Sequence, residues 1–461
     1  MERLNVKNIF GGVQWAVFLI ASSIAAPIAI ASIFGLDTTD TALFVQRTMF
    51  VLGIACLVQA FIGHRMPINE GPAGLWWGIF IVYAGLVGIM YSTTGESLQA
   101  LQSGLLYSGI LFIVFAYTGL VDKLKIFFTP TITFVYLLLL VLQISESILT
   151  GLMGIVSEGD SVDGIVLMGG IIVILLTFFF MSHKALWVSR YSILFAISAG
   201  WLIFWSLGKS PEAGSGGSSL VSLPEMLVFG PVIWDSGMFV TALFLTILLI
   251  ANMMASIKVM ESVLKNSFAI QAPDRIKQAS AASGINHIIA GLFSSIGPVP
   301  ISGAAGFVSA TRTPALKPFI FGGVIVILIS FFPSLMAILA SLPAPVAYAV
   351  IFAVFTKMVE MAFTELENEK NRQHSYKVAA FGLMSGVGIM FVPAASMANL
   401  PSVLAATLSN GLITGYHYRH SCGAAIAMAA QKILKKAERI YVRPALFNFI
   451  FSSDGKNRYY R

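Results

Sequence analysis

The chain has 461 residues, of which 57% are hydrophobic and only 11% are charged, and its formal net charge is +7. An ordinary soluble domain carries roughly a quarter charged residues, so this composition excludes a soluble enzyme, a disordered chain and a secreted disulfide scaffold. Long unbroken apolar runs favour membrane-spanning helices over a β-barrel, whose strands would show short alternating runs. We assign the excess positive charge to loops on the cytoplasmic side of a membrane and not to nucleic-acid binding.

Apolar segments follow one another along the chain, and the third and tenth of them are short or interrupted by Gly and Pro. A helical span needs about 20 residues, so 14 spans would use roughly 60% of the chain. We therefore predict 14 transmembrane segments, at 11–35, 44–63, 71–90, 97–119, 127–152, 164–182, 188–207, 236–262, 277–296, 302–312, 316–340, 343–363, 376–393 and 400–418.

The basic residues predict how these spans are oriented. If the N-terminus is cytoplasmic and the spans alternate, the Lys and Arg residues gather in cytoplasmic segments, and only Arg47 and Lys209 fall outside. Lys and Arg are enriched in the cytoplasmic loops of membrane proteins. We predict a multi-pass plasma-membrane protein with both termini in the cytoplasm.

A loop rich in Gly and Ser, at 210–219, separates seven predicted spans from seven. Because seven is odd, the second half enters the membrane from the opposite side, which is the inverted-repeat arrangement of many transporters. We divide the chain into a first repeat, an extracellular linker, a second repeat and a basic cytoplasmic tail, at 1–208, 209–235, 236–418 and 419–461.

A short sequence echo precedes the third predicted span of each half. The first copy is Met66-Pro-Ile-Asn-Glu-Gly-Pro-Ala-Gly74 and the second is Val299-Pro-Ile-Ser-Gly-Ala-Ala-Gly306. Proline favours extended backbone, which membranes tolerate only where it is buried in protein or lines a cavity. The half-helix that follows points free N–H groups and a positive dipole end at that cavity. The echo predicts a polar cup near the bilayer midplane, and tight helix packing by small residues is the alternative interpretation.

The run from Gly303 to Arg312 resembles the signature of the nucleobase:cation symporter-2 family, also called nucleobase–ascorbate transporters. Gly306, Thr311 and Arg312 match that signature, whereas Gly303 and Ala304 replace its polar pair. The resemblance extends to about residue 418 and is nearest to the purine permease branch. It implies an all-α fold of 14 spans in a 7+7 inverted repeat, with spans 1–4 and 8–11 as a core domain and spans 5–7 and 12–14 as a gate domain. It also implies a homodimer that moves a purine or pyrimidine base with protons or sodium.

Two departures from the family pattern concern the substrate site. The resemblance places an acidic ligand in the eighth span, where this chain has Asn252, and a second polar ligand at Gly303. An Asn still offers a donor and an acceptor to a base, although a hydrogen bond between helices is the alternative role, and Ser256 lies one turn further on the same face. We predict substrate contacts from the two echoes and the eighth span, at Glu70, Gly71, Ala73, Gly74, Asn252, Ser256, Ser302, Gly303 and Ala304.

Glu70 is the ionisable residue of the first echo. An alignment without a gap sets it opposite Gly303, which suggests that the carboxylate of the site has moved from one repeat to the other. The alternative alignment treats Glu70 as one residue inserted in the first copy. An ionisable group inside a membrane protein is a functional hypothesis by default, and burial favours the protonated form of a carboxyl group. Glu70 is therefore the predicted proton-coupling residue, and an ion pair with Arg65 nearer the cytoplasmic surface is the alternative.

These features predict a proton-coupled symporter for purines such as xanthine, uric acid or hypoxanthine that works by alternating access. The alternatives are an uncoupled facilitator, a transporter of another small solute, neutral or anionic, such as uracil or an aromatic acid, and a membrane sensor that does not transport. We expect no enzymatic activity, no cofactor and no metal, because the sequence has no catalytic motif, phosphate-binding glycine loop or Cys/His metal spacing.

Overall fold

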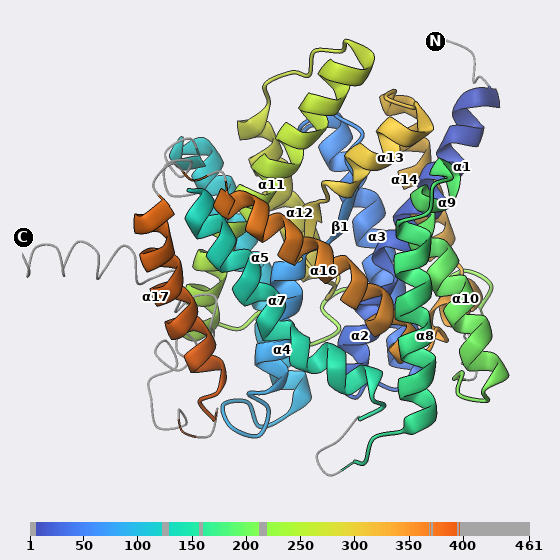
Figure 1. Cartoon of the computed structure of the whole chain (residues 1–461), viewed down its shortest axis with the longest axis vertical. Helices are drawn as coiled ribbons and strands as arrows, with labels where there is room; N and C mark the ends of the chain where they lie inside the picture. The colour runs from blue at the N-terminus through green and yellow to red at the C-terminus, as the bar shows by residue number, and fades with distance from the viewer. Residues whose placement is uncertain are drawn as a thin grey trace, which may run out of the picture.

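The computed structural model describes residues 6–121, 129–155, 160–211, 219–367, 369, 372–393 and 396, and it is built almost wholly of helices (Figure 1). The first half contains α1 (Val6–Ser23), α2 (Ala25–Ile33), α3 (Thr38–Phe61), β1 (Glu70–Pro72), α4 (Gly74–Ala84), α5 (Thr94–Tyr117), α7 (Pro130–Leu152), α8 (Gly164–Met181), α9 (Leu186–Arg190) and α10 (Ser192–Ser206). The second half contains α11 (Ser236–Phe268), α12 (Ile276–Leu292), β2 (Pro298–Pro300), α13 (Gly303–Thr311), α14 (Leu316–Ser330), α15 (Pro333–Ala340), α16 (Ala344–Glu367) and α17 (Arg372–Met390).

Every predicted span before 400–418 contains a helix, and the last predicted span and the tail at 419–461 lie outside the described residues. Seven helices of the described part are long and apolar enough to cross a membrane, and the bent pair α14–α15 makes an eighth. This is fewer than the 14 predicted spans, because several of those spans consist of shorter helices. The predicted third and tenth spans are indeed short, with 11 residues in α4 and 9 in α13.

Proline interrupts two of the predicted spans. The first span is divided between α1 and α2, with Pro27 in the first turn of α2. The eleventh is bent by 94° between α14 and α15, where Pro333 begins the second helix. Proline has no backbone N–H and clashes with the preceding turn of a helix, so it ends a helix or begins a new one.

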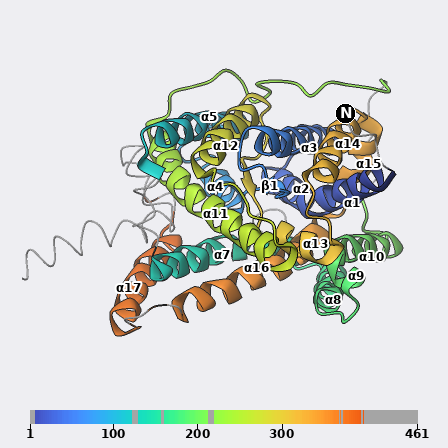
Figure 2. The ribbon, with the colours of Figure 1, turned by 90° about the horizontal axis from the view of Figure 1, so that it is seen from above.

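The helices form two groups that lie side by side when the molecule is seen from above (Figure 2). We call α1–α5 and α11–α15 the core group, in which α5 packs on α12 and α14 packs on α1 and α3. We call α7–α10, α16 and α17 the gate group, in which α16 packs on α7 and α8. The gate group contacts the core group mainly where α16 meets α2 and where α7 meets α4.

Small residues bring the core helices close together. A Cβ atom added to Gly284 of α12 would stand 2.7 Å from the carbonyl oxygen of Gly109 on α5, and one added to Gly109 would stand 2.7 Å from that of Gly284. Membrane helices associate through such small-residue contacts because lipid supplies little hydrophobic drive. This packing fixes α12 beside α5 and so positions β2, which follows α12.

Candidate functional site

The two predicted extended segments form an antiparallel strand pair at the centre of the core group. Glu70 of β1 lies opposite Pro300 of β2, and Gly71 lies opposite Val299. Two further hydrogen bonds extend the pair, from Ile301 N–H to the Asn69 carbonyl at 2.9 Å and from Ala73 N–H to the Gly297 carbonyl at 3.0 Å. The strand pair therefore ties the two sequence echoes to each other.

A half-helix begins directly after each strand, α4 at Gly74 and α13 at Gly303. Their N-cap residues, Ala73 and Ser302, make no side-chain capping hydrogen bond. The first-turn N–H groups of a helix have no partner within the helix and carry a partial positive charge. In α13, however, the Ala304 and Ala305 N–H groups donate to the Ile301 and Ser302 carbonyls, at 3.2 and 3.0 Å. The start of α4 therefore offers its first-turn N–H groups to a carbonyl or anionic oxygen, whereas at α13 such an oxygen accepts from the Gly303 N–H or shares the other two donors.

The eighth predicted span, α11, is held to this strand pair through Ser256. Its buried Oγ donates a hydrogen bond to the Pro300 carbonyl at 2.8 Å. Asn252, one turn earlier, is half-buried, and within the described residues its side chain makes no hydrogen bond. Ser256 thus acts as a link between α11 and β2, whereas the amide of Asn252 is available to a ligand.

The two half-helix ends differ in how they are covered. Gly303 and Gly306 of α13 are exposed, and a Cβ atom added to Gly306 would meet nothing within 4 Å. Ala304, between them, is fully buried. A Cβ atom added to Gly74 of α4 would instead meet Phe355 of α16 at 3.4 Å and Leu140 of α7 at 3.8 Å. Side chains of the gate group therefore cover the start of α4, while the glycine face of α13 is open.

The remaining signature residues end α13. The Thr311 hydroxyl donates to the Phe307 carbonyl at 2.8 Å, which is a bond within the same helix. Arg312 is exposed and has the left-handed φ of 54° that closes the helix. In this structure both residues belong to the end of α13 that is remote from Ser302 and Gly303.

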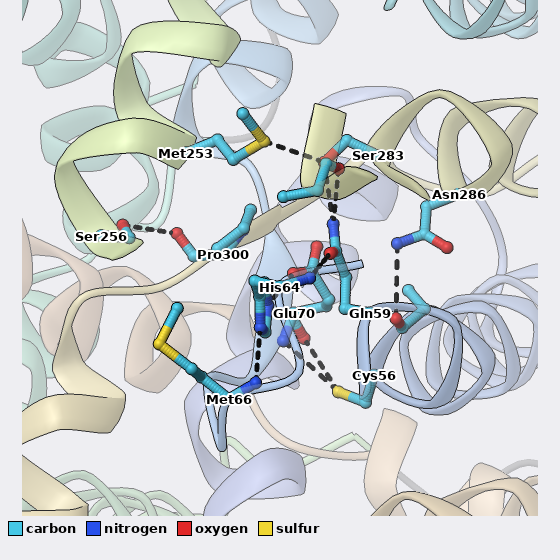
Figure 3. A network of polar contacts seen from close by, with 12 residues as sticks. Cys56, Gln59, His64, Met66, Glu70, Met253, Ser256, Ser283, Asn286 and Pro300 are labelled. Carbon is cyan, nitrogen blue, oxygen red and sulfur yellow. Dashed lines mark hydrogen bonds and ion pairs between the residues drawn. The ribbon is translucent and has the colours of Figure 1, made fainter. Parts of the chain in front are cut away.

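Glu70 is completely buried, and its side chain lies beside His64 (Figure 3). The distance from Glu70 Oε1 to His64 Nε2 is 3.9 Å, and the Glu70 N–H donates to the sulfur of Cys56 at 3.3 Å. Neither carboxyl oxygen of Glu70 has a hydrogen-bond partner among the described residues. The alternative prediction that Glu70 pairs with Arg65 is wrong, because Arg65 is exposed and its Nε donates to the Phe61 carbonyl.

The gapless alignment of the two echoes is also wrong. Gly303 is the first residue of α13, whereas Glu70 lies four residues before the first residue of α4, Gly74. The reason is that Pro67 precedes β1, and it is Pro72 that ends this strand as Pro300 ends β2. Glu70 faces Pro300 across the strand pair and does not occupy the position that corresponds to Gly303.

Sequence reasoning did not anticipate the polar residues that surround Glu70. Gln59 of α3 donates to the Ala279 carbonyl and to Ser283 on α12, at 3.2 and 3.0 Å. Asn286 of α12 donates to the Ala55 carbonyl on α3 at 3.3 Å. Their signal was present, since an amide in the middle of an apolar helix is costly and calls for a partner.

Metal binding has no support in this cluster. In the part of the chain that the structure describes, no group of three or more His, Cys, Asp or Glu side chains is placed to hold a metal ion. The polar side chains of this cluster are the amides of Gln59 and Asn286, the hydroxyl of Ser283, the thiol of Cys56, the imidazole of His64 and the carboxyl group of Glu70. Its chemistry is suited to hydrogen bonds and to a proton.

Apolar helices of spanning length around two half-helices define a multi-span membrane protein. Residues 6–395 match the model of the Permease family. The chain belongs to this family, which is the nucleobase:cation symporter-2 family that its signature resembles.

Two curated Bacillus subtilis proteins are similar over most of their length. The protein named "Putative purine permease YwdJ" is 42% identical over 415 residues, which is 89% of this chain and 94% of that protein. "Uric acid permease PucK" is 22% identical over 88% of this chain and 92% of that protein. Both relatives are thus matched almost end to end.

Solved structures share the fold at low sequence identity. The transmembrane domain of the cyanobacterial bicarbonate transporter BicA superposes with a TM-score of 0.60 at 16% identity, covering 88% of this chain and 98% of that domain. The murine anion transporter Slc26a9, in its inward-facing state, gives 0.61 at 12% identity over 94% of this chain and 69% of that protein. These likenesses establish the fold alone.

Proposed function

We propose that this protein transports nucleobases, and purines such as xanthine, uric acid or hypoxanthine above all, by alternating access in symport with protons. The observation that carries the proposal is the strand pair that joins two half-helices without side-chain caps. The chain that contains it belongs to the Permease family. The names of YwdJ and PucK, which refer to purines and uric acid, support a purine substrate.

The polar groups at the starts of α4 and α13, which we call the cup, suit the edge of an oxopurine. Carbonyl oxygens of the base accept from the first N–H groups of α4 and α13, where positive helix-dipole ends favour them. Gly303 is exposed, so a flat ring can approach the backbone there. At Gly74 a ring can approach only after Phe355 moves aside. The Asn252 amide supplies a donor and an acceptor to the remaining edge of the base.

The complete set of proposed substrate contacts follows from this arrangement. Backbone groups of the half-helices and of the segments before them contribute most of these contacts, together with two side chains of α11. The set is Glu70, Gly71, Ala73, Gly74, Asn252, Ser256, Ser302, Gly303 and Ala304. Ser256 acts in it through the Pro300 carbonyl that it holds. Glu70 is the residue of this set that we assign to proton coupling.

Alternating access requires the core group to move against the gate group. The strand pair is hydrogen-bonded to α11, and α12 is hydrogen-bonded to α11 and to α3, so these elements move as one body. Phe355 and Leu140 reach the start of α4 from the gate group, so the contacts that cover the cup are those that break when the groups separate. These are the contacts expected of a gate.

We further propose the complete architecture as 14 spans in two inverted repeats. The first repeat is 1–208, the linker 209–235 is extracellular, the second repeat is 236–418, and the tail 419–461 is cytoplasmic, as is the N-terminus. The short third and tenth spans, one in each half, support the repeat. We propose a homodimer in the plasma membrane.

The test is uptake of labelled xanthine, uric acid, hypoxanthine, guanine and uracil into proteoliposomes, with and without an inward proton gradient. We expect gradient-driven accumulation of at least one oxopurine. Exchange of a base without its accumulation would show that the protein is an uncoupled facilitator. If none of the five bases enters or exchanges, the proposed substrate class is wrong, and small anions become the next substrates to assay.

A further inference from the structure

A histidine and a carboxyl group are buried together beside the strand pair. His64 follows α3, and Glu70 is the first residue of β1 (Figure 3). Their side chains are 1% and 0% exposed, and Nε2 lies 3.9 Å from Oε1. His64 Nε2 and both Glu70 oxygens lack a hydrogen-bond partner among the described residues. Three polar atoms that the fold leaves unsatisfied therefore gather at one place.

The backbone fixes the tautomer of His64. The Met66 N–H donates a hydrogen bond to His64 Nδ1 at 3.0 Å. A ring nitrogen that accepts a hydrogen bond carries no proton, so the single proton of the neutral imidazole is on Nε2, next to Glu70. A second proton on the ring would have to displace the Met66 amide. His64 is therefore a neutral donor directed at Glu70.

No positive charge compensates Glu70 in the described structure. On α3, Cys56 is uncharged and accepts the Glu70 N–H. On α12, His287 is bonded through Nδ1 to the Ser283 carbonyl. Arg275, the residue before α12, donates to the carbonyls of Ile62 and Gly63. An isolated buried carboxylate is far more costly than the neutral acid, so Glu70 is protonated in this conformation.

Resting on the transport function proposed above, we infer that His64 and Glu70 form its proton site. Glu70 takes up and releases the proton, and the Nε2–H of His64 stabilises the carboxylate that release leaves behind. The present distance of 3.9 Å is longer than a hydrogen bond, and a movement of about 1 Å would close it. The proton enters from water on one side of the membrane and leaves to water on the other.

The strand pair connects this proton site to the cup. Glu70 lies opposite Pro300, and the Pro300 carbonyl is held by Ser256 of α11. A movement of β1 that brings Glu70 to His64 therefore also moves β2 and the start of α13. In this way one backbone unit carries both the proton-binding residue and the substrate-binding half-helices.

The first test compares three variants in proteoliposomes that contain a pH-sensitive dye. Glu70→Gln cannot release a proton, so gradient-driven accumulation and proton influx are lost, and base exchange at equal pH measures separately how far the variant still binds base. His64→Leu removes the donor to the carboxylate, so the midpoint of the pH dependence of uptake moves up by about one to two pH units. His64→Gln is the matched control, because its oxygen accepts from Met66 and its NH₂ group donates to Glu70. It keeps the wild-type profile.

Several outcomes would overturn the inference. If wild type exchanges a base but a proton gradient does not drive its uptake, or a sodium gradient does so instead, the proton site is wrong and transport stands. The proton site is also wrong if Glu70→Gln still accumulates base with the gradient, or if uptake by His64→Leu and by His64→Gln depends on pH in the same way.

A second measurement does not depend on transport. Infrared difference spectra of purified wild type against Glu70→Gln report the carbonyl stretch of a protonated carboxylic acid. We expect this band at neutral pH in wild type. Its loss should occur at the same pH in wild type and His64→Gln, and at a higher pH in His64→Leu. Absence of the band at neutral pH would refute a protonated Glu70, even if no base were transported.

Discussion

Phe355 of the gate group lies over Gly74, the first residue of α4. The ring atom Cζ of Phe355 would stand 3.4 Å from a Cβ atom at Gly74, and its ring centroid lies 5.7 Å from that of Trp77. The indole Nε1 of Trp77 is buried and has no partner among the described residues. A base that approaches the start of α4 must therefore displace the Phe355 ring or stack on it.

We predict that Phe355→Ala weakens base binding. Stacking of a base on an aromatic ring contributes about 1–3 kcal/mol, so KM should rise roughly 5- to 100-fold. Phe355→Tyr should remain close to wild type. Phe363→Ala on the same helix is the control, because Phe363 is 52% exposed. Concentration-dependent uptake measures KM, and an unchanged KM for every transported base would contradict the role of Phe355.

A hydrogen bond between the two helix groups should control how readily they separate. The Tyr348 hydroxyl on α16 donates to the Ala29 carbonyl on α2 at 3.1 Å. Tyr348→Phe removes this hydrogen bond and should weaken the association of the two helix groups by about 0.5–1.5 kcal/mol. The population of separated groups should then increase by about 2- to 10-fold. The readout is the labelling rate of a cysteine introduced at Ser32, one turn after Ala29. Tyr376→Phe on the exposed face of α17 should leave that rate unchanged.

The packing of α5 on α12 predicts a stability effect. Gly284→Ala would place a methyl group 2.7 Å from the Gly109 carbonyl oxygen and 2.6 Å from a side-chain carbon of Ile113. Overpacking of this kind costs about 1–3 kcal/mol, and we expect a lower Tm in detergent. Gly164→Ala is the matched control, since its Cβ would meet nothing within 4 Å. Equal Tm values for the two variants would show that the helices can move apart freely.

The N-terminus of α8 predicts a pH dependence outside the membrane span. Asp163 caps α8, and its hydrogen bond with Lys209 at 2.7 Å, followed by those from the Val166 and Ile165 N–H groups, lowers the pKa of its carboxyl group. A depressed pKa in the folded state means that this stabilisation is present above the unfolded pKa of about 3.9 and is lost as pH falls through the folded value.

Asp163→Asn isolates the charge, because Asn caps a helix as well as Asp does. We expect the wild-type Tm to fall more steeply than that of Asp163→Asn as the pH is lowered from about 5 to about 3. The difference should shrink in high salt, since the pair is exposed and screened. Parallel Tm curves at low salt would show that Lys209 does not stabilise the cap.

The sequence predicted the central elements of the site but not how they meet. Proline and glycine before short apolar segments indicated extended backbone and half-helices, and β1, β2, α4 and α13 are present. Pairing between strands from distant parts of the chain is not encoded locally, and either Pro67 or Pro72 could have ended the first strand. Only the folded backbone selects Pro72.

The surroundings of Glu70 depended on backbone geometry in the same way. Proximity in sequence suggested Arg65 as its partner, but Arg65 adopts a left-handed φ of 57° and its side chain lies at the surface. His64, the residue before it, is the one that is buried beside Glu70. A sequence pattern records that a polar residue is present, whereas a turn decides which side chain faces inward.

The pairing of β1 with β2 also has a consequence for synthesis of the chain in the cell. Residues 70–72 leave the ribosome long before residues 298–300, and until then the backbone groups of β1 that β2 will satisfy have no partner strand. Unsatisfied backbone groups within the bilayer cost several kcal/mol each. The first half therefore cannot complete its structure while it is being inserted, and its final assembly waits for the second half to reach the membrane.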